Sequence, residues 1–125
     1  MTAINEWSPL KKVVVGIADN ARMPQVEDSH RYINHCDKAW QDIQVGPYDQ
    51  TVIDQANEDL NVMVKHLEAE DVEVVRPAVN DCEYYNYCPR DNVFHHGDIT
   101  IASPMPVYAR RNEWKAFAHH LNNVI

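Results

Sequence analysis

Histidine and cysteine are the residue types in this 125-residue chain that could hold a metal ion or act as a nucleophile. The three cysteines, Cys36, Cys82 and Cys88, include no Cys-x-x-Cys pair, which argues against a disulfide framework and against a ribbon-type zinc site. The densest group of possible metal ligands is His30 with His35-Cys36, and its spacing matches no closed tetrahedral pattern. We therefore expect reduced thiols, and neither a metal nor a cofactor.

A carboxylate, Asp91, lies in the segment Pro89-Arg90-Asp91, directly before a run of residues that favour a β-strand. From the residue types alone, this aspartate is expected to pair with Arg90 or to cap the turn before the strand. Both of these roles are structural, and neither requires a ligand.

The composition describes one compact domain, residues 1–125, with an acidic surface. Apolar residues make up 45% of the chain, and a formal charge of −8 opposes binding to a phosphate backbone or to an anionic membrane. No apolar run approaches the length of about 20 residues that spans a bilayer, and no basic and apolar leader follows Met1. We expect a cytoplasmic protein that binds neither nucleic acid nor membranes.

Strand and helix signals alternate along the chain. The β-branched run Lys12–Gly16 predicts a buried strand, and the segment from Asp19 to Tyr48 is irregular, with a short helix expected around Asp28–Trp40. Apolar residues spaced by three or four predict an amphipathic helix over Thr51–Glu70, and the alternating segment Asp71–Pro77 predicts a half-buried strand.

The last third of the chain predicts a hairpin and a second helix. Two β-prone runs surround the turn at Gly97 and predict a hairpin over Val93–Ala102. Apolar residues at helical spacing predict a helix over Glu113–Ile125. The resulting order fits a repeated β-β-α-β unit whose second copy lacks its final strand. An unfinished copy leaves an uncovered sheet edge and apolar surface, so we expect a homo-oligomer rather than a monomer.

An ordered set of short motifs resembles the N-terminal third of the glycine (arginine:glycine) amidinotransferase family. These motifs are Asn5-Glu6-Trp7-Ser8-Pro9-Leu10 leading into Val13-Val14-Val15-Gly16, Glu73-Val74-Val75-Arg76-Pro77, Pro89-Arg90-Asp91, Gly97, Pro104-Met105, Arg110 and Glu113. The resemblance implies an α/β fold of the pentein type, in which β-β-α-β modules form an α/β propeller, with one and a half to two modules present here. It also implies transfer of an amidino group from L-arginine to an amine such as glycine, through a covalent amidino-cysteine.

The resemblance also assigns roles to individual residues. It implies that Asp91 binds the substrate guanidinium, a role that suits a carboxylate because its two oxygens match the planar fork of N–H donors. Arg90, Arg110 and Glu113 are then expected to support the site as an ion-pair set. Tyr108 stands where the family more often has a further arginine.

The family's second guanidinium-binding carboxylate, its histidine acid/base and its nucleophilic cysteine fall outside the segment that this chain resembles. Cys88 occupies a position that is not catalytic in the family and precedes a proline, so we interpret it as an inert packed thiol. We therefore expect no catalytic residue in this chain and no activity of the chain alone. Its expected partners are arginine or another guanidino compound, further copies of itself, or complementing pentein modules. The alternatives are a guanidino-binding module without turnover and a self-assembling scaffold.

Overall fold

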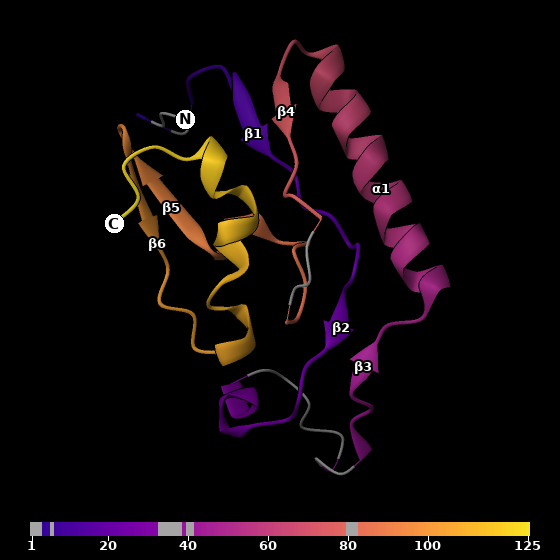
Figure 1. Cartoon of the computed structure of the whole chain (residues 1–125). Coiled ribbons are helices and arrows are strands. Elements are labelled where there is room, and N and C mark those ends of the chain that lie inside the picture. Colours follow the sequence, from indigo (N-terminus) through magenta and orange to yellow (C-terminus); the bar gives the residue numbers. More distant parts are fainter. Residues whose placement is uncertain (1–3, 6, 33–38, 40–41, 80–82) are drawn as a thin grey trace.

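The computed structural model describes residues 4–5, 7–32, 39, 42–79 and 83–125 of the chain (Figure 1). In the described part, short strands form three two-stranded sheets, β1 with β4, β2 with β3, and β5 with β6. The strands are β1 (Lys12–Val14), β2 (Arg22–Met23), β3 (Gly46–Pro47), β4 (Glu73–Val75), β5 (Val93–His96) and β6 (Ile99–Ala102). The helices are α1 (Gln50–Ala69) and the 3₁₀ segments η1 (Asp28–Tyr32), η3 (Pro89–Asp91), η4 (Tyr108–Arg110) and η5 (Glu113–His120).

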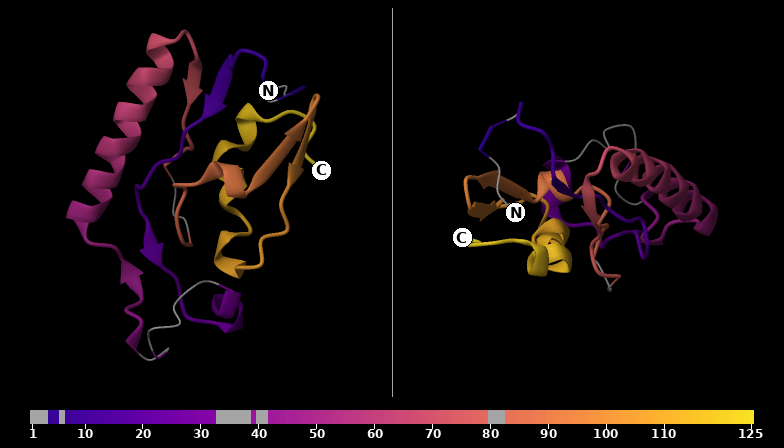
Figure 2. Two further views of the ribbon diagram at one scale, coloured as in Figure 1. Left: turned by 180° about the vertical axis from the view of Figure 1, so that it is seen from behind. Right: turned by 90° about the horizontal axis from the view of Figure 1, so that it is seen from above.

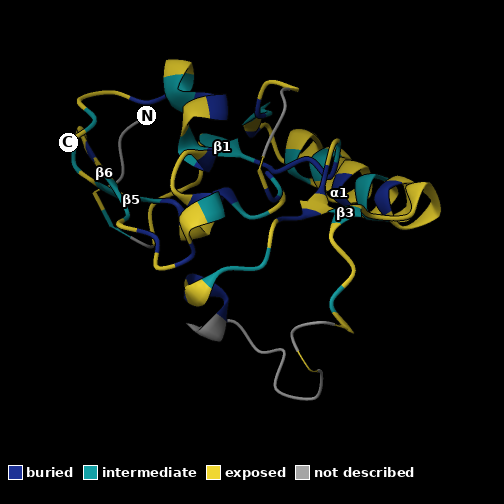
Figure 3. Cartoon of the chain, turned by 60° about the horizontal axis from the view of Figure 1, so that its bottom comes forward, coloured by how far each residue is buried: buried dark blue, intermediate teal, exposed yellow. Residues whose placement is uncertain are grey.

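The long helix α1 confirms the amphipathic pattern of its sequence. It begins after Asp49, whose carboxylate accepts a hydrogen bond from the Thr51 backbone N–H at 2.8 Å and so satisfies one unpaired donor of the first turn. Ile53 and Leu60, seven residues apart, are buried on one face, and exposed residues line the outward side of the helix (Figure 3). Met63 is one of the apolar residues spaced by three or four that predicted this helix, but it is 51% exposed.

A sheet separates α1 from the hairpin. Strand β4 follows the helix and pairs with β1 in parallel, with Val13 opposite Val74, and α1 packs on β4 (Figure 2). The hairpin of β5 and β6 lies on the other side of β1, and its register places Phe94 opposite Ile101. Gly97 turns the hairpin with φ of 60°, a conformation that glycine adopts at low cost.

The C-terminal segment differs from its prediction. The helical stripe over Glu113–Ile125 forms the 3₁₀ helix η5 as far as His120, after which the backbone becomes extended. The Ile125 N–H donates to the Thr100 carbonyl at 2.9 Å, and the Ala102 N–H donates to the Ile125 carbonyl at 3.0 Å. As expected, no named strand follows this helix, but the chain end pairs in parallel beside β6 through an isolated bridge between Thr100 and Val124.

Local residue preferences explain why the helix ends early. Asn122 and Asn123 favour turns over helix interiors, Asn123 adopts φ of 45°, and Val124 and Ile125 are β-branched. The apolar positions were nevertheless identified correctly as core. Phe117 is 1% exposed and forms a buried cluster with Ala116 and Leu121. Partly buried side chains pack against this cluster: Val14, Val93, Trp114 and Val124.

The irregular segment before α1 contains two short paired strands. Arg22 lies opposite Pro47 and Met23 opposite Gly46 in an antiparallel pair. The short helix expected around Asp28–Trp40 begins as η1, and much of the remaining range lies outside the described residues. No helix in the described part is long and apolar enough to cross a membrane.

Gly16 fits where two backbone segments come into contact. Ile17 forms an antiparallel bridge with Asn86, and a Cβ added to Gly16 would lie 2.0 Å from the Tyr87 carbonyl oxygen. At Gly97, a Cβ would have nothing within 4 Å, so only the positive φ opposes a larger residue there. The two glycines are therefore required for different reasons.

We expect Gly16→Ala to lower the free energy of unfolding by about 3 kcal/mol or to prevent folding, because the methyl group overlaps backbone rather than a movable side chain. Gly97→Ala should cost only about 1–2 kcal/mol, the strain of a left-handed residue. Urea denaturation of both variants measures the difference. Equal losses would show that the contact between Gly16 and Tyr87 is not a close one.

Candidate guanidinium site

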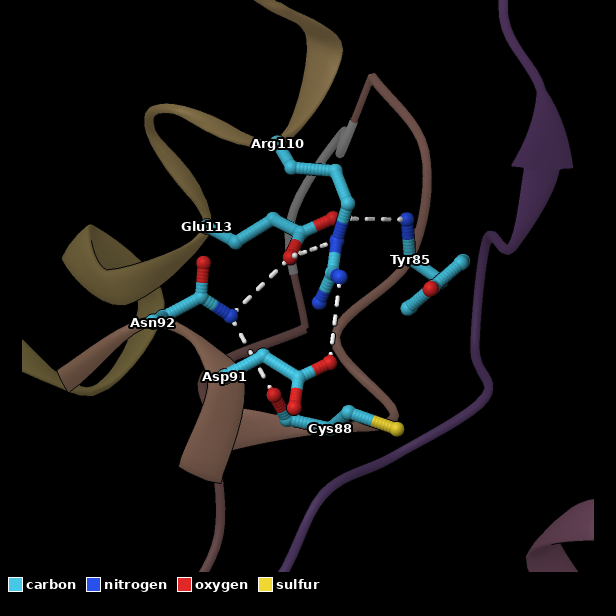
Figure 4. A network of polar contacts seen from close by, with 6 residues as sticks. All are labelled: Tyr85, Cys88, Asp91, Asn92, Arg110 and Glu113. Atoms are coloured by element: carbon cyan, nitrogen blue, oxygen red, sulfur yellow. Dashed lines mark hydrogen bonds and ion pairs between the residues drawn. The ribbon is translucent and has the colours of Figure 1, made fainter. Parts of the chain in front are cut away.

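The carboxylate of Asp91 is held by three short segments that are distant in sequence. The 3₁₀ turn η3 begins at Pro89, a residue suited to the first turn because its missing N–H needs no partner there, and presents Asp91 at its end. The η4 turn supplies Arg110, and the start of η5 supplies Glu113. Figure 4 shows these side chains converging in front of the Tyr85 backbone.

Arg110 bridges two carboxylates. Its Nη1 donates to Asp91 Oδ2 at 3.1 Å and its Nε donates to Glu113 Oε2 at 2.9 Å (Figure 4). Glu113 also accepts from Asn92 Nδ2 at 3.0 Å and from the Tyr85 backbone N–H at 3.3 Å. The guanidinium carbon of Arg110 lies 4.6 Å from the centre of the Tyr85 ring, within the range of a cation–π contact.

The two carboxylates differ in exposure. Arg110 and Glu113 are 7% and 5% exposed, whereas the Asp91 side chain is 49% exposed. Arg110 Nη2 is buried and has no hydrogen-bond partner among the described residues, which also offer no donor to Asp91 Oδ1. The buried pair therefore anchors a carboxylate whose second oxygen is available to a ligand.

Burial and charge act in opposite directions on this pair. Burial raises the pKa of Glu113, and Arg110, Asn92 and the Tyr85 N–H oppose that rise by favouring the charged form. Burial lowers the pKa of Arg110, but the carboxylates outweigh it and the net shift is upward. Because three N–H groups are directed at the Glu113 carboxylate, we assign the pair as ionised at neutral pH.

The structure brings some, but not all, of the predicted site residues together. Asp91, Arg110 and Glu113 come together, whereas Arg90 is exposed and its side chain forms no hydrogen bond or ion pair with the other described residues of the network. Tyr108 packs its ring 3.8 Å from the guanidinium carbon of Arg111. The expected alternative of an ion pair between Asp91 and Arg90 is not formed, and Asp91 pairs with Arg110 through Oδ2 instead.

Two members of the network were missed by the sequence analysis. Asn92 is 1% exposed, and its side-chain amide links Glu113 to the Cys88 carbonyl. An asparagine directly after the Pro-Arg-Asp segment carries no sequence signal for burial. Tyr85 contributes a backbone N–H, which no residue type reveals.

Cys88 is close in sequence to Asp91 but its sulfur is not directed at the site. The Sγ atom points away from the Asp91 carboxylate (Figure 4) and lines a cavity of about 250 Å³ together with Tyr85 and Tyr87. Burial, followed by the Asp91 charge, raises the pKa of the thiol, which therefore stays protonated at neutral pH. Cys36 and Cys82 lie outside the described residues, as does His35.

Metal ligands do not converge in the described part of the chain. No group of three or more histidine, cysteine, aspartate or glutamate side chains is placed to hold an ion there. The His30 ring is 3% exposed and its Nδ1 faces the Glu27 carbonyl. The site described above is thus a site of charge and hydrogen bonds.

The fold is shared with a solved amidinotransferase. The structure of the inosamine-phosphate amidinotransferase of Streptomyces griseus superposes on this chain with a TM-score of 0.78 and 24% sequence identity. The match covers 98% of this chain and 42% of that chain. At that identity the likeness establishes the fold alone, which is a mixed α/β portion of the pentein fold.

Sequence comparison specifies the family more closely, although no family model matches the chain. It is 32% identical to inosamine-phosphate amidinotransferase 1 of Streptomyces glaucescens over 127 aligned residues, which cover 90% of this chain and 36% of that protein. It is 31% identical to mitochondrial glycine amidinotransferase of Xenopus laevis over 128 aligned residues, which cover 90% of this chain and 30% of that protein. The chain resembles an N-terminal portion of the amidinotransferases and spans about a third of the length of these curated relatives.

The buried ion pair generates a prediction about stability. We expect Glu113→Gln to lower the free energy of unfolding by about 3 kcal/mol, because it leaves the Arg110 charge in the interior without its main partner. Glu73→Gln is the matched control, since Glu73 is 61% exposed in its pair with Lys12 and should cost less than about 1 kcal/mol. Urea denaturation measures both. Similar losses would mean that the Glu113 charge does not organise the network.

Proposed function

We propose that this chain supplies the guanidinium-binding carboxylate, Asp91, of an amidinotransferase-type reaction. The observation that carries the proposal is that two carboxylates share the single guanidinium of Arg110. One negative charge is left uncompensated, and it belongs to the half-exposed Asp91. A cationic ligand is therefore favoured over an anionic one. The similarity to amidinotransferases supports a guanidino compound as that ligand.

The network would fix the orientation of the Asp91 carboxylate before a ligand binds. Arg110 holds Oδ2, so the plane of the Asp91 carboxylate is set, and Oδ1 is left to accept an N–H from the ligand. A carboxylate that is already oriented loses little side-chain entropy on binding. Asp91 would thus align an arginine guanidinium rather than only attract it.

In the family reaction that we propose for the assembled protein, a cysteine thiolate attacks the amidino carbon of L-arginine and ornithine leaves with a proton. The acceptor amine then attacks the amidino-cysteine, and the thiolate is released. The first step needs a thiolate, and both steps need a group that transfers protons. In the described part of the chain no thiolate is directed at Asp91, because Cys88 is protonated and points away, so we propose that these residues come from outside this segment.

We also interpret the fold as successive modules of the pentein type. In this interpretation β1, β2, α1 and β4 form the first module, and the hairpin, η5 and the residues paired with β6 form most of the second. The order of elements supports this division. The relatives are named for different acceptors, inosamine phosphate and glycine, so the proposal concerns the guanidino donor only. A cytoplasmic location stays a prediction.

Because the described residues place no thiolate at Asp91, the 125-residue chain should form no ornithine from arginine with glycine as the acceptor. Ornithine release from the purified chain, measured by mass spectrometry, tests this expectation. Turnover that disappears in Cys88→Ala would contradict it and make Cys88 the nucleophile. Turnover that survives that change would point to a contaminating enzyme, which a second purification by a different route removes.

Asp91→Asn should weaken arginine binding to the chain by roughly ten- to a hundredfold, because a charge-assisted hydrogen bond is worth about 1.5–3 kcal/mol. Calorimetry with arginine and with guanidinium ion measures the affinity. Asp59→Asn, an exposed change on α1, is the control that removes the same charge elsewhere. Equal binding by Asp91→Asn and the control would show that Asp91 has only a structural role in the η3 turn.

A separate observation supports the alternative function, a self-assembling scaffold. The outward face of the hairpin exposes three large apolar side chains, Phe94 at 60%, Ile99 at 41% and Ile101 at 41%. The edge of β6 is already covered, so this face, rather than an open edge, now supports the proposal of a homo-oligomer.

We expect light scattering with size exclusion to give a mass above that of the monomer at micromolar concentration, and Phe94→Ser to shift it toward the monomer. Val62→Ser, which removes a 48% exposed valine from α1, should leave the mass unchanged. A monomeric mass for the unmodified chain would exclude the scaffold alternative.

A further inference from the structure

Strand β1 has one edge that pairs and one edge that does not. The Lys11 carbonyl accepts from Glu73 and the Val15 N–H donates to Val75, so the residues between them alternate toward and away from β4. The backbone groups of Lys12 and Val14 therefore point to the opposite edge. Among the described residues, β1 has no strand neighbour other than β4.

A groove of about 650 Å³ runs along this edge. One wall is the continuous segment Leu10–Val14, and the other includes Pro89, Arg90, Val93 and His95 from the η3 turn and β5. The N-terminal segment also contributes to the lining, through Ile4, Asn5, Ser8 and Pro9. Leu10 is 50% exposed, so apolar surface is open to solvent there. The groove is separate from the Asp91 carboxylate, which is not part of its lining.

The charged residues in the described lining of the groove are all cationic. Its described lining includes Lys11, Lys12 and Arg90 and no carboxylate, although the chain as a whole has a charge of −8. Lys12 pairs with Glu73 at 2.6 Å, whereas Lys11 and Arg90 are exposed. An acidic chain thus presents a local cationic rim beside unpaired backbone donors and acceptors.

We propose that this groove binds an extended acidic segment of a partner polypeptide, which adds a strand to the free edge of β1. Backbone hydrogen bonds to Lys12 and Val14 would supply the pairing, as in other cases of strand addition, and the cationic rim would select carboxylates. A strand of about five residues, roughly 17 Å long, matches Leu10–Val14. A second copy of this chain is a poorer occupant, because its own β1 edge carries the same cations.

The probe is a synthetic seven-residue peptide that alternates glutamate and valine, added to the ¹⁵N-labelled chain. We expect the amide signals of Lys12, Val14 and Val93 to shift on titration, and the binding to weaken with added salt. A peptide with lysine in place of glutamate should not bind. An N-methylated acidic peptide, which cannot form the strand pairing, should bind about tenfold more weakly or not at all.

Variants of the chain separate the backbone from the charges. Lys12→Pro removes an N–H that points away from β4, a position where an edge strand tolerates proline, and should abolish binding. Lys12→Ala is its control, since it loses the same charge but keeps the N–H, and should bind within about threefold of the unmodified chain. Arg90→Glu, an exposed change, should weaken binding about three- to tenfold without affecting folding.

Several results would overturn the proposal. These are equal binding of the acidic and lysine peptides, equal binding of the N-methylated peptide, or no loss of affinity in Arg90→Glu and in a folded Lys12→Pro. If the amide signals of Lys12 and Val14 shifted with protein concentration in the absence of peptide, the edge would instead be assigned to contact between copies of the chain.

Discussion

The Glu113 carboxylate, buried at the start of η5, receives N–H groups from three other segments. It accepts from Arg110, from Asn92 and from the Tyr85 backbone, so a single side chain ties together η4, the residue between η3 and β5, and the segment before η3. A buried charge is costly unless donors surround it, and here the donors come from segments that secondary structure does not connect. The position of each of these segments therefore depends on this carboxylate.

The exposure of Asp91 follows from the same arrangement. Arg110 is held in the interior by Glu113 and by the Tyr85 ring, and only its Nη1 reaches outward to Asp91. If the guanidinium were at the surface, solvent would screen it and Asp91 would have no fixed orientation. Because Arg110 is buried, the Asp91 carboxylate that it holds is both oriented and accessible to solvent.

The sheet and the core around this network also restrict what the site can contain. Gly16 lets the backbone after β1 contact the segment at Tyr87, which directly precedes Cys88. The cavity that Cys88 lines has neither Asp91 nor Glu113 in its lining, and it shares only Tyr85 with the network. Among the described residues, the opposite edge of β1 has no strand neighbour, and the Asp91 carboxylate is not part of the lining of the groove beside that edge.

Local patterns in the sequence determined α1, the strand that follows it, the hairpin at Gly97 and the apolar positions Phe117 and Leu121, because spacing and turn chemistry act over a few residues. The ordered motifs likewise indicated the amidinotransferase resemblance and singled out Asp91. The sequence did not determine that the last residues pair with β6, or that Arg110 rather than the adjacent Arg90 holds Asp91. Those outcomes depend on contacts between segments about 20 or more residues apart, such as Thr100 with Ile125 and Asp91 with Arg110. Only the tertiary structure decides them, because hydrogen-bond partners at such separation are chosen by which donors and acceptors burial brings together.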